Sequence, residues 1–204
     1  MYRSAVGGLL YLCHTRPDIA QAVGVVCKYS SDPSDAHWTA VKRIFRYLKG
    51  TTSYGISFTK GKDLKLLGYA DADYAGDLDS RKSTSGYVFF LNGAPVSCSS
   101  KAQATVAQST AEAEYVAAND AVREAVWLRL LLEELGLKQQ GATLLWQDNQ
   151  GAIAIAKNPE SHSRTKHIDV KHHYIRGGED DPCHTAGSPM LPICIHQLQF
   201  FLTR

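Results

Sequence analysis

The chain has 204 residues, a formal net charge of +2 at pH 7 and a hydrophobic fraction of 44%, which is an ordinary composition for a globular protein. Because the charge is so small, composition alone gives no argument for a nucleic-acid partner, and such binding has to depend on local groups of basic residues. Five scattered cysteines without a paired spacing predict reduced thiols rather than a disulfide framework or a zinc site. The first residues lack the layout of a signal peptide, and Gly7, Gly8 and His14 interrupt the apolar stretch after them. We therefore expect an intracellular protein that is neither secreted nor inserted in a membrane.

The first fifty residues predict three helical stretches. The first ends near Cys13, the second is opened by residues 17–18, and the third is opened by residues 32–34. On the third stretch, five apolar residues recur at helical spacing, namely Trp38, Val41, Ile44, Phe45 and Leu48. Its other side carries four basic residues, namely Lys42, Arg43, Arg46 and Lys49. That basic side is either a solvated surface or a contact for a polyanion.

From Tyr54 onward, short runs rich in aromatic and β-branched residues alternate with turn residues, which predicts a mixed sheet with helices packed on it. The predicted strands cover residues 54–59, 64–71, 84–91, 95–100 and 143–147. Between the third and the fourth, Asn92 and Gly93 predict a tight hairpin turn, because both residues tolerate a positive φ.

A long helix is predicted to begin near Ser109 and to stop at Gly136. Ser109 and Glu112 have the spacing of a capping box, and glycine is the usual helix terminator. Further predictions are a short helix at 150–157, a polar loop at 158–165 and a helix at 167–176. Residues 177–204 show no sustained period, and we expect them to be poorly ordered or loosely docked.

Three acidic residues occupy positions where a carboxylate is costly unless a cation meets it. Asp71 and Asp148 each end an apolar run, and Glu114 lies in the apolar stripe of the long helix. Taken singly, two of them have a plain structural explanation: Asp148 as a helix cap, Glu114 as a solvated residue of a first helical turn. Taken together, they predict a site for hard divalent cations. Asp73 shares a strand face with Asp71, so the sequence leaves open which of the two faces the site.

Five segments then form an ordered series: residues 69–77, 81–87, 109–115, 148–150 and 166–170. With them, the chain resembles the ribonuclease H domain of copia-type long-terminal-repeat retrotransposon Pol polyproteins. Residues 2–12, 16–19 and 46–51 resemble the segment that joins the reverse transcriptase to that domain.

This resemblance implies an α/β, ribonuclease H-like mixed sheet preceded by a helical segment. It implies three regions: a connection segment at 1–53, the ribonuclease H-like domain at 54–176 and an atypical tail at 177–204. It also implies a catalytic set of metal-binding acids, namely Asp71, Glu114, Asp148 and Asp169. These acids would hold two Mg²⁺ ions, with Mn²⁺ as a substitute, and Asp71 would bridge the pair.

The implied activity is cleavage of the RNA strand of RNA–DNA hybrids. The implied partners are the hybrid and the reverse transcriptase part of the parent polyprotein, with no membrane, and the implied location is a cytoplasmic particle or the nucleus. Recognition of a hybrid would depend on backbone shape. The expected phosphate contacts are Arg81, Lys82, Lys101, Lys42 and Arg46.

The chain departs from the family pattern in three places. Residues 98–103 read Cys-Ser-Ser-Lys-Ala-Gln where the family usually has Trp-x-Ser-Lys-Lys-Gln, an unrelated tail follows Arg176, and the Tyr-x-Asp-Asp signature of the polymerase is absent. The alternative is therefore a catalytically inactive ribonuclease H-like module that binds nucleic acid or protein. An integrase on the same fold is disfavoured, since Glu114 lies between the two aspartates instead of after them.

Overall fold

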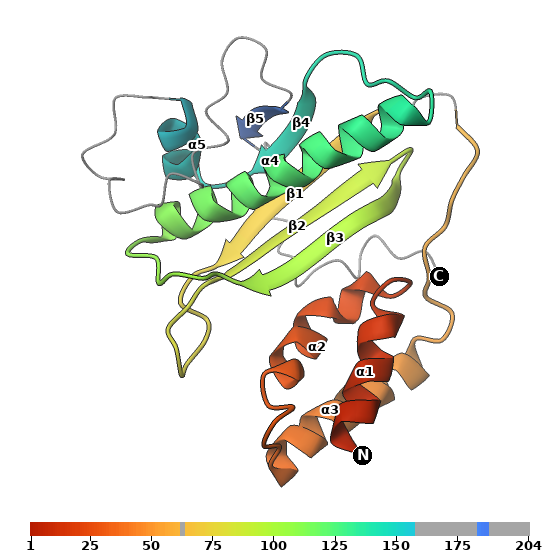
Figure 1. Cartoon of the computed structure of the whole chain (residues 1–204), viewed down its shortest axis with the longest axis vertical. Helices are drawn as coiled ribbons and strands as arrows, with labels where there is room; N and C mark the ends of the chain where they lie inside the picture. Colours follow the sequence, from red (N-terminus) through yellow and green to blue (C-terminus); the bar gives the residue numbers. More distant parts are fainter. Residues whose placement is uncertain (62–63, 158–182, 188–204) are drawn as a thin grey trace. The chain divides into compact units, whose positions relative to one another are not determined.

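A computed structural model describes residues 1–61, 64–157 and 183–187 (Figure 1). The chain divides into two compact units, one running from Met1 to Ser57 and the other starting at Phe58. The boundary expected from the sequence lies between residues 53 and 54. The helix expected at 167–176 and the loop expected at 158–165 lie outside the described residues.

The first unit is helical, with elements α1 (Tyr2–Leu12), η1 (Pro17–Ile19), α2 (Ala20–Cys27) and α3 (Asp35–Gly50). Ser34 caps α3 in a capping box with His37. The helices share one apolar core, made of Tyr2, Val6, Leu9, Ile19, Val23, Val26, Val41 and Ile44. This unit therefore has a core of its own.

Helix α3 differs from its expected apolar face at one residue. Val41 and Ile44 are buried, whereas the ring of Phe45 is 45% exposed. Phe45 directly follows Ile44, so it turns away from the stripe by the 100° step of a helix and lies beside the exposed basic residues Lys42 and Arg46.

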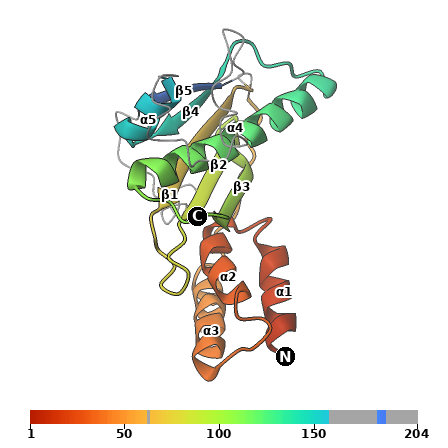
Figure 2. The same ribbon diagram turned by 60° about the vertical axis from the view of Figure 1, so that its left-hand side comes forward.

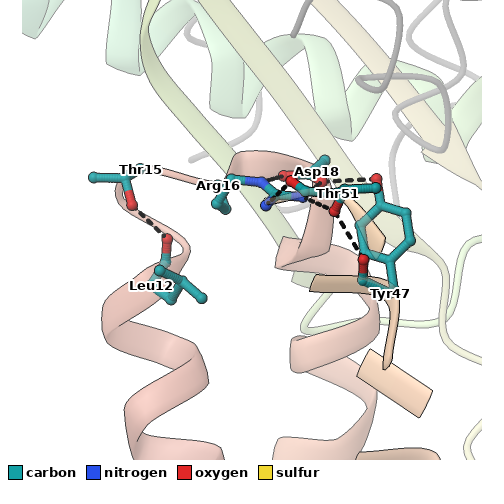
Figure 3. Close-up of polar contacts among 6 residues, drawn as sticks. All are labelled: Leu12, Thr15, Arg16, Asp18, Tyr47 and Thr51. Atoms are coloured by element: carbon teal, nitrogen blue, oxygen red, sulfur yellow. Dashed lines mark hydrogen bonds and ion pairs between the residues drawn. The ribbon is translucent and has the colours of Figure 1, made fainter. Parts of the chain in front are cut away.

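A buried ion pair ties the loop after α1 to the end of α3 (Figure 3). The Arg16 guanidinium donates to both carboxylate oxygens of Asp18, at 3.0 and 2.8 Å. It also donates to the backbone oxygen and the hydroxyl of Thr51, at 3.0 and 2.7 Å. The hydroxyl of Tyr47 donates to Asp18 at 2.8 Å. Because these groups come from residues up to 35 positions apart, the network fixes how the helices of this unit meet.

The second unit is built on a mixed five-stranded sheet in the order β3-β2-β1-β4-β5. The strands are β1 (Leu66–Asp73), β2 (Thr84–Leu91), β3 (Ala94–Ala102), β4 (Thr143–Gln147) and β5 (Cys183–Gly187). The pairs β1–β2 and β2–β3 are antiparallel, and the pairs β1–β4 and β4–β5 are parallel. The predicted mixed α/β class is confirmed, and the arrangement is compatible with a ribonuclease H-like fold.

The β2–β3 hairpin forms as predicted. Leu91 pairs with Ala94, which leaves Asn92 and Gly93 as a two-residue turn with φ values of 52° and 80°. Positive φ at both turn positions matches the right-handed twist of the strands, and glycine reaches it without steric cost.

One predicted strand is absent, and one strand forms where none was predicted. Residues 54–59 form no strand of the sheet, because the backbone N–H of Tyr54 turns back to the oxygen of Thr51 and the Tyr54 ring lies against the Arg16 guanidinium. Conversely, β5 lies within the segment expected to be a loosely docked tail. Its backbone pairs with β4 along all five residues, from Thr143 with Cys183 to Gln147 with Gly187. Ladder hydrogen bonds join backbone groups, so this strand forms without a periodic side-chain pattern.

Helix α4 (Thr110–Glu134) lies across one face of the sheet, as Figures 1 and 2 show. Their common core includes residues of both: Leu66, Ala70, Phe89, Tyr115, Ala118, Ala121, Val122, Ala125 and Leu145. Helix α5 (Gln150–Lys157) contributes Ala152 to that core. In the described part of the chain, no helix has the length and apolar character needed to cross a bilayer.

Candidate metal centre

Asp71 and Asp148 lie at the same end of the sheet, at the carboxyl ends of the parallel strands β1 and β4. Tyr69 of β1 pairs with Trp146 of β4, and Asp71 and Asp148 follow these residues by two positions each. Because the strands are parallel, their carboxyl ends meet at the same edge of the sheet, with Asp71 in β1 and Asp148 one residue after β4. The parallel register thus joins two residues 77 positions apart (148 − 71).

The structural alternative for Asp148 does not hold, because Asn149 caps the helix that follows. The side-chain oxygen of Asn149 accepts a hydrogen bond from the backbone N–H of Ala152 at 3.0 Å, and its backbone oxygen accepts one from Ile153. Asn149 therefore fills the capping role. The exposed carboxylate of Asp148 is therefore not needed as the cap of this helix.

Glu114 comes from the start of α4. Ser109 caps this helix by accepting from the backbone N–H of Glu112 at 3.2 Å, which is the serine half of the predicted capping box. The carboxylate of Glu112 accepts from the backbone N–H of Gln108 at 2.8 Å. Glu114 itself is only 7% exposed, so it is not a solvated residue of the first turn.

The structure brings Asp71, Glu114 and Asp148 together. One carboxylate oxygen of each lies within 4.8 Å of the other two. The sequence left open whether Asp71 or Asp73 faces the site. In the structure Asp71 joins the cluster, and the exposed carboxylate of Asp73 lies against Gly76 instead. Asp169, the fourth expected acid, is outside the described residues.

Electrostatics disfavour three bare carboxylates at this separation. Burial raises the pKa of Glu114 to about 7, and the neighbouring charges of Asp71 and Asp148 act in the same direction. A hydrogen bond from Gln147 acts against them and lowers the pKa. A bound divalent cation relieves both costs, since it neutralises the repulsion and replaces lost hydration. Three acidic oxygens at one point are ligands that hard cations such as Mg²⁺ and Mn²⁺ prefer, so the residues present fit such an ion.

The expected basic contacts are not part of this cluster. Arg81 and Lys82 lie in the loop after β1, where Arg81 has a φ of 56° and its N–H donates to the oxygen of Asp77 at 2.8 Å. Lys101 is exposed near the end of β3 and lines a hollow of about 400 Å³ beside α4. Lys42 and Arg46 are exposed on α3 in the first unit.

Two glutamines that the sequence did not single out contact the first turns of α4. Gln103 is 5% exposed and Gln147 is 3% exposed. A usable signal existed for Gln147, which continues the alternation of Thr143 and Leu145 toward the helix-covered face. Gln103 follows β3 without any periodic pattern to mark it.

The fold and the cluster together identify the class of protein. It is a mixed α/β protein with a carboxylate site suited to divalent cations. The chain is 51% identical over 181 residues to the retrovirus-related Pol polyprotein from transposon TNT 1-94 of Nicotiana tabacum, a match that covers 88% of the chain. It is 45% identical over 175 residues to that from transposon RE2 of Arabidopsis thaliana, covering 86% of the chain. Over most of its length, the chain's homologues are thus copia-type retrotransposon Pol polyproteins.

The matched region is a small part of those polyproteins, 14% of the tobacco protein and 12% of the Arabidopsis one. A shorter relative, secreted RxLR effector protein 161 of Plasmopara viticola, is 56% identical over 128 residues, which cover 62% of the chain and 90% of that protein. No family model matches the chain.

Proposed function

We propose that the chain is a retrotransposon-derived ribonuclease H that cleaves the RNA strand of RNA–DNA hybrids with divalent cations. The observation that carries this proposal is the meeting of Asp71, Glu114 and Asp148, from three separate elements, within 4.8 Å of one another. The similarity to retrovirus-related Pol polyproteins supports a role in retroelement replication.

The three acids would hold the cations, with Asp169 as the fourth ligand that the family resemblance implies. Bound divalent ions would supply an activated water and neutralise charge on the leaving oxygen of a phosphodiester. The chain's own residues supply position: β1 and β4 fix two carboxylates through the sheet register, and α4 fixes the third. Since Glu114 must be ionised to act as a ligand, its pKa of about 7 makes cation binding pH-dependent near neutrality.

For the nucleic acid, we propose backbone contacts from exposed basic residues. Lys101 lies on β3 opposite Ser85, whose neighbour Gly86 pairs with Asp71, so Lys101 is two strands away from the cluster. Arg81 and Lys82 precede the same strand, β2. Lys42 and Arg46 are the corresponding basic residues that we propose for the first unit. Phosphate contacts of this kind carry little sequence information.

A hybrid-cleavage assay with a matched pair of variants tests the proposal. Asp71→Asn removes a cluster carboxylate, whereas Asp73→Asn changes an exposed acid on the same strand and face. We expect the first to lower the Mg²⁺-dependent cleavage rate by at least about 100-fold and the second to leave it within a few-fold. Absence of cleavage by the wild-type chain, or equal loss in both variants, contradicts the proposal.

A second candidate function is a catalytically inactive module that binds nucleic acid or protein. The similarity to the Plasmopara protein favours it, because the match spans nearly all of a short protein whose name describes a secreted effector rather than a polymerase. The replaced residues at 98–103 point the same way. This candidate predicts binding of a hybrid, measured by fluorescence anisotropy, that survives both a chelator and Asp71→Asn.

A further inference from the structure

We propose that Gln147 and Gln103 are positioning residues, which hold the first turns of α4 against the sheet so that Glu114 presents its carboxylate to the cluster. This inference rests on the proposed cation site. Neither residue is proposed to touch a cation or a substrate.

The two side-chain amides reach consecutive carbonyl groups of one helical turn. Nε2 of Gln103 donates to the backbone oxygen of Ala113 at 2.9 Å, and Nε2 of Gln147 donates to that of Glu114 at 2.9 Å. Gln103 comes from the residue after β3 and Gln147 from the end of β4, so the turn is held from two sides. The backbone of Glu114 thereby has a defined place between the strands.

These bonds are not needed to form the helix. In α4, each of the two carbonyls faces the N–H four residues later, so the glutamine amides use the second lone pair of the oxygen. Their loss would therefore leave the helix intact and release its position relative to the sheet. A helical turn that can shift would let Glu114 move away from Asp71 and Asp148.

Both glutamines also lie close in the chain or in the sheet to the residues that carry the other acids. Gln147 directly precedes Asp148, and its Nε2 lies 3.3 Å from Oε2 of Glu114. Gln103 donates to the hydroxyl of Ser85 at 2.9 Å, and Ser85 precedes Gly86, the partner of Asp71 in the sheet. The pair thus connects α4 with the end of β4 and with β2, the strand that pairs with β1.

The two glutamines hold Glu114 in place against its electrostatic repulsion by Asp71 and Asp148. Asp71 and Asp148 both disfavour the ionised form of Glu114, whereas the Gln147 hydrogen bond favours it. The position of Gln103 also costs free energy of folding, because within the described ranges its buried Oε1 has no hydrogen-bond partner and an unpaired buried acceptor is destabilising. The amide keeps this orientation because its Nε2 then donates to both Ser85 and Ala113.

The test measures Mn²⁺ affinity by electron paramagnetic resonance and unfolding by urea, on the full chain. Gln147→Met and Gln103→Met remove the amides at nearly constant volume. Gln139→Met is the matched control, since Gln139 also bonds backbone groups, Leu66 N–H at 2.8 Å and Leu64 oxygen at 2.9 Å, but at the opposite end of β1.

We expect Gln147→Met and Gln103→Met each to weaken Mn²⁺ binding by about 10-fold, the range found for residues that orient metal ligands, with unfolding no more affected than in Gln139→Met. Gln139→Met should bind Mn²⁺ as the wild type does. In a Glu114→Gln background, Gln147→Met should cause no further loss, because the residue acts through Glu114.

Three results would overturn the inference: affinities equal to that of Gln139→Met, an undiminished effect in the Glu114→Gln background, or loss of the folded state in both variants, which would assign the pair to stability alone. Failure of hybrid cleavage would not bear on it, because the readout is cation affinity. Failure of the wild-type chain to bind Mn²⁺ would remove both this inference and the proposed function.

Discussion

At the scale of single residues, Glu114 combines requirements that oppose each other. It is buried, which favours the neutral form, and it lies beside two further acids, which favours the neutral form again. Without a cation the ionised site is therefore a source of instability, as is common where function needs a strained arrangement.

Glu114→Gln should make the cation-free protein more stable above pH 7. The folded-state pKa of about 7 is above the ordinary 4.5, so the folded protein holds more protons between these values and its stability falls as pH rises through that window. Allowing for partial solvent screening, the loss is on the order of 2 kcal/mol. Urea unfolding at pH 5 and pH 8 with a chelator measures it. The variant should lack this difference, and an identical pH dependence in both proteins would refute the assignment.

A glycine in β1 allows close packing against side chains of the two neighbouring strands. A Cβ atom at Gly68 would collide with the ring of Phe89 and approach a methyl group of Leu145 at 2.9 Å, and both residues are fully buried. Gly68→Ala should therefore lower the free energy of unfolding by about 1–3 kcal/mol, as overpacking does. Gly8→Ala is the contrasting variant, because nothing lies within 4 Å of its Cβ in helix α1. It should stabilise by about 0.5–1 kcal/mol, and urea titration of both proteins checks the opposite signs.

At the scale of elements, the Arg16–Asp18 pair decides how the helices of the first unit meet (Figure 3). The side chains are 8% and 0% exposed, so neither charge is compensated by water. Removing one partner of a buried pair leaves the other charge unpaired, which costs more than the pair contributes.

Asp18→Ala should destabilise the first unit by about 3–5 kcal/mol. The control is Glu133→Ala, because the Lys138–Glu133 pair is 67% and 51% exposed and is expected to contribute less than about 1 kcal/mol. Hydrogen exchange on α1 and α3 reports the first variant. Similar effects of the two substitutions would show that the Arg16 network does not hold the unit together.

At the scale of the whole molecule, the two compact units have separate apolar cores. Ligands of the cluster should therefore act on one unit alone. Mn²⁺ at about 100 times its Kd should stabilise the second unit by about 2.7 kcal/mol and leave exchange in α1 and α3 unchanged. Asp18→Ala should show the reverse pattern. Equal protection of both units by Mn²⁺ would contradict their independence.

Local patterns were enough to predict much of the fold. The bounds of β2, β4 and α5 agree with the predicted 84–91, 143–147 and 150–157, and the hairpin turn lies at Asn92 and Gly93. These features depend on neighbouring residues only: side-chain alternation, helix caps and residues that tolerate a positive φ. The acids at strand ends were visible for the same reason, although their role as metal ligands stays a prediction.

The sequence by itself determined most of the strands and helices and which acids stand out, because both follow from short-range patterns. Only the tertiary structure decided that β5 pairs with β4, that Asp71 rather than Asp73 joins the cluster, and that Asn149 rather than Asp148 caps α5. It also decided the pKa of Glu114. The physical reason is that strand pairing, burial and charge repulsion act through space between groups far apart in the chain, and no local pattern encodes those distances.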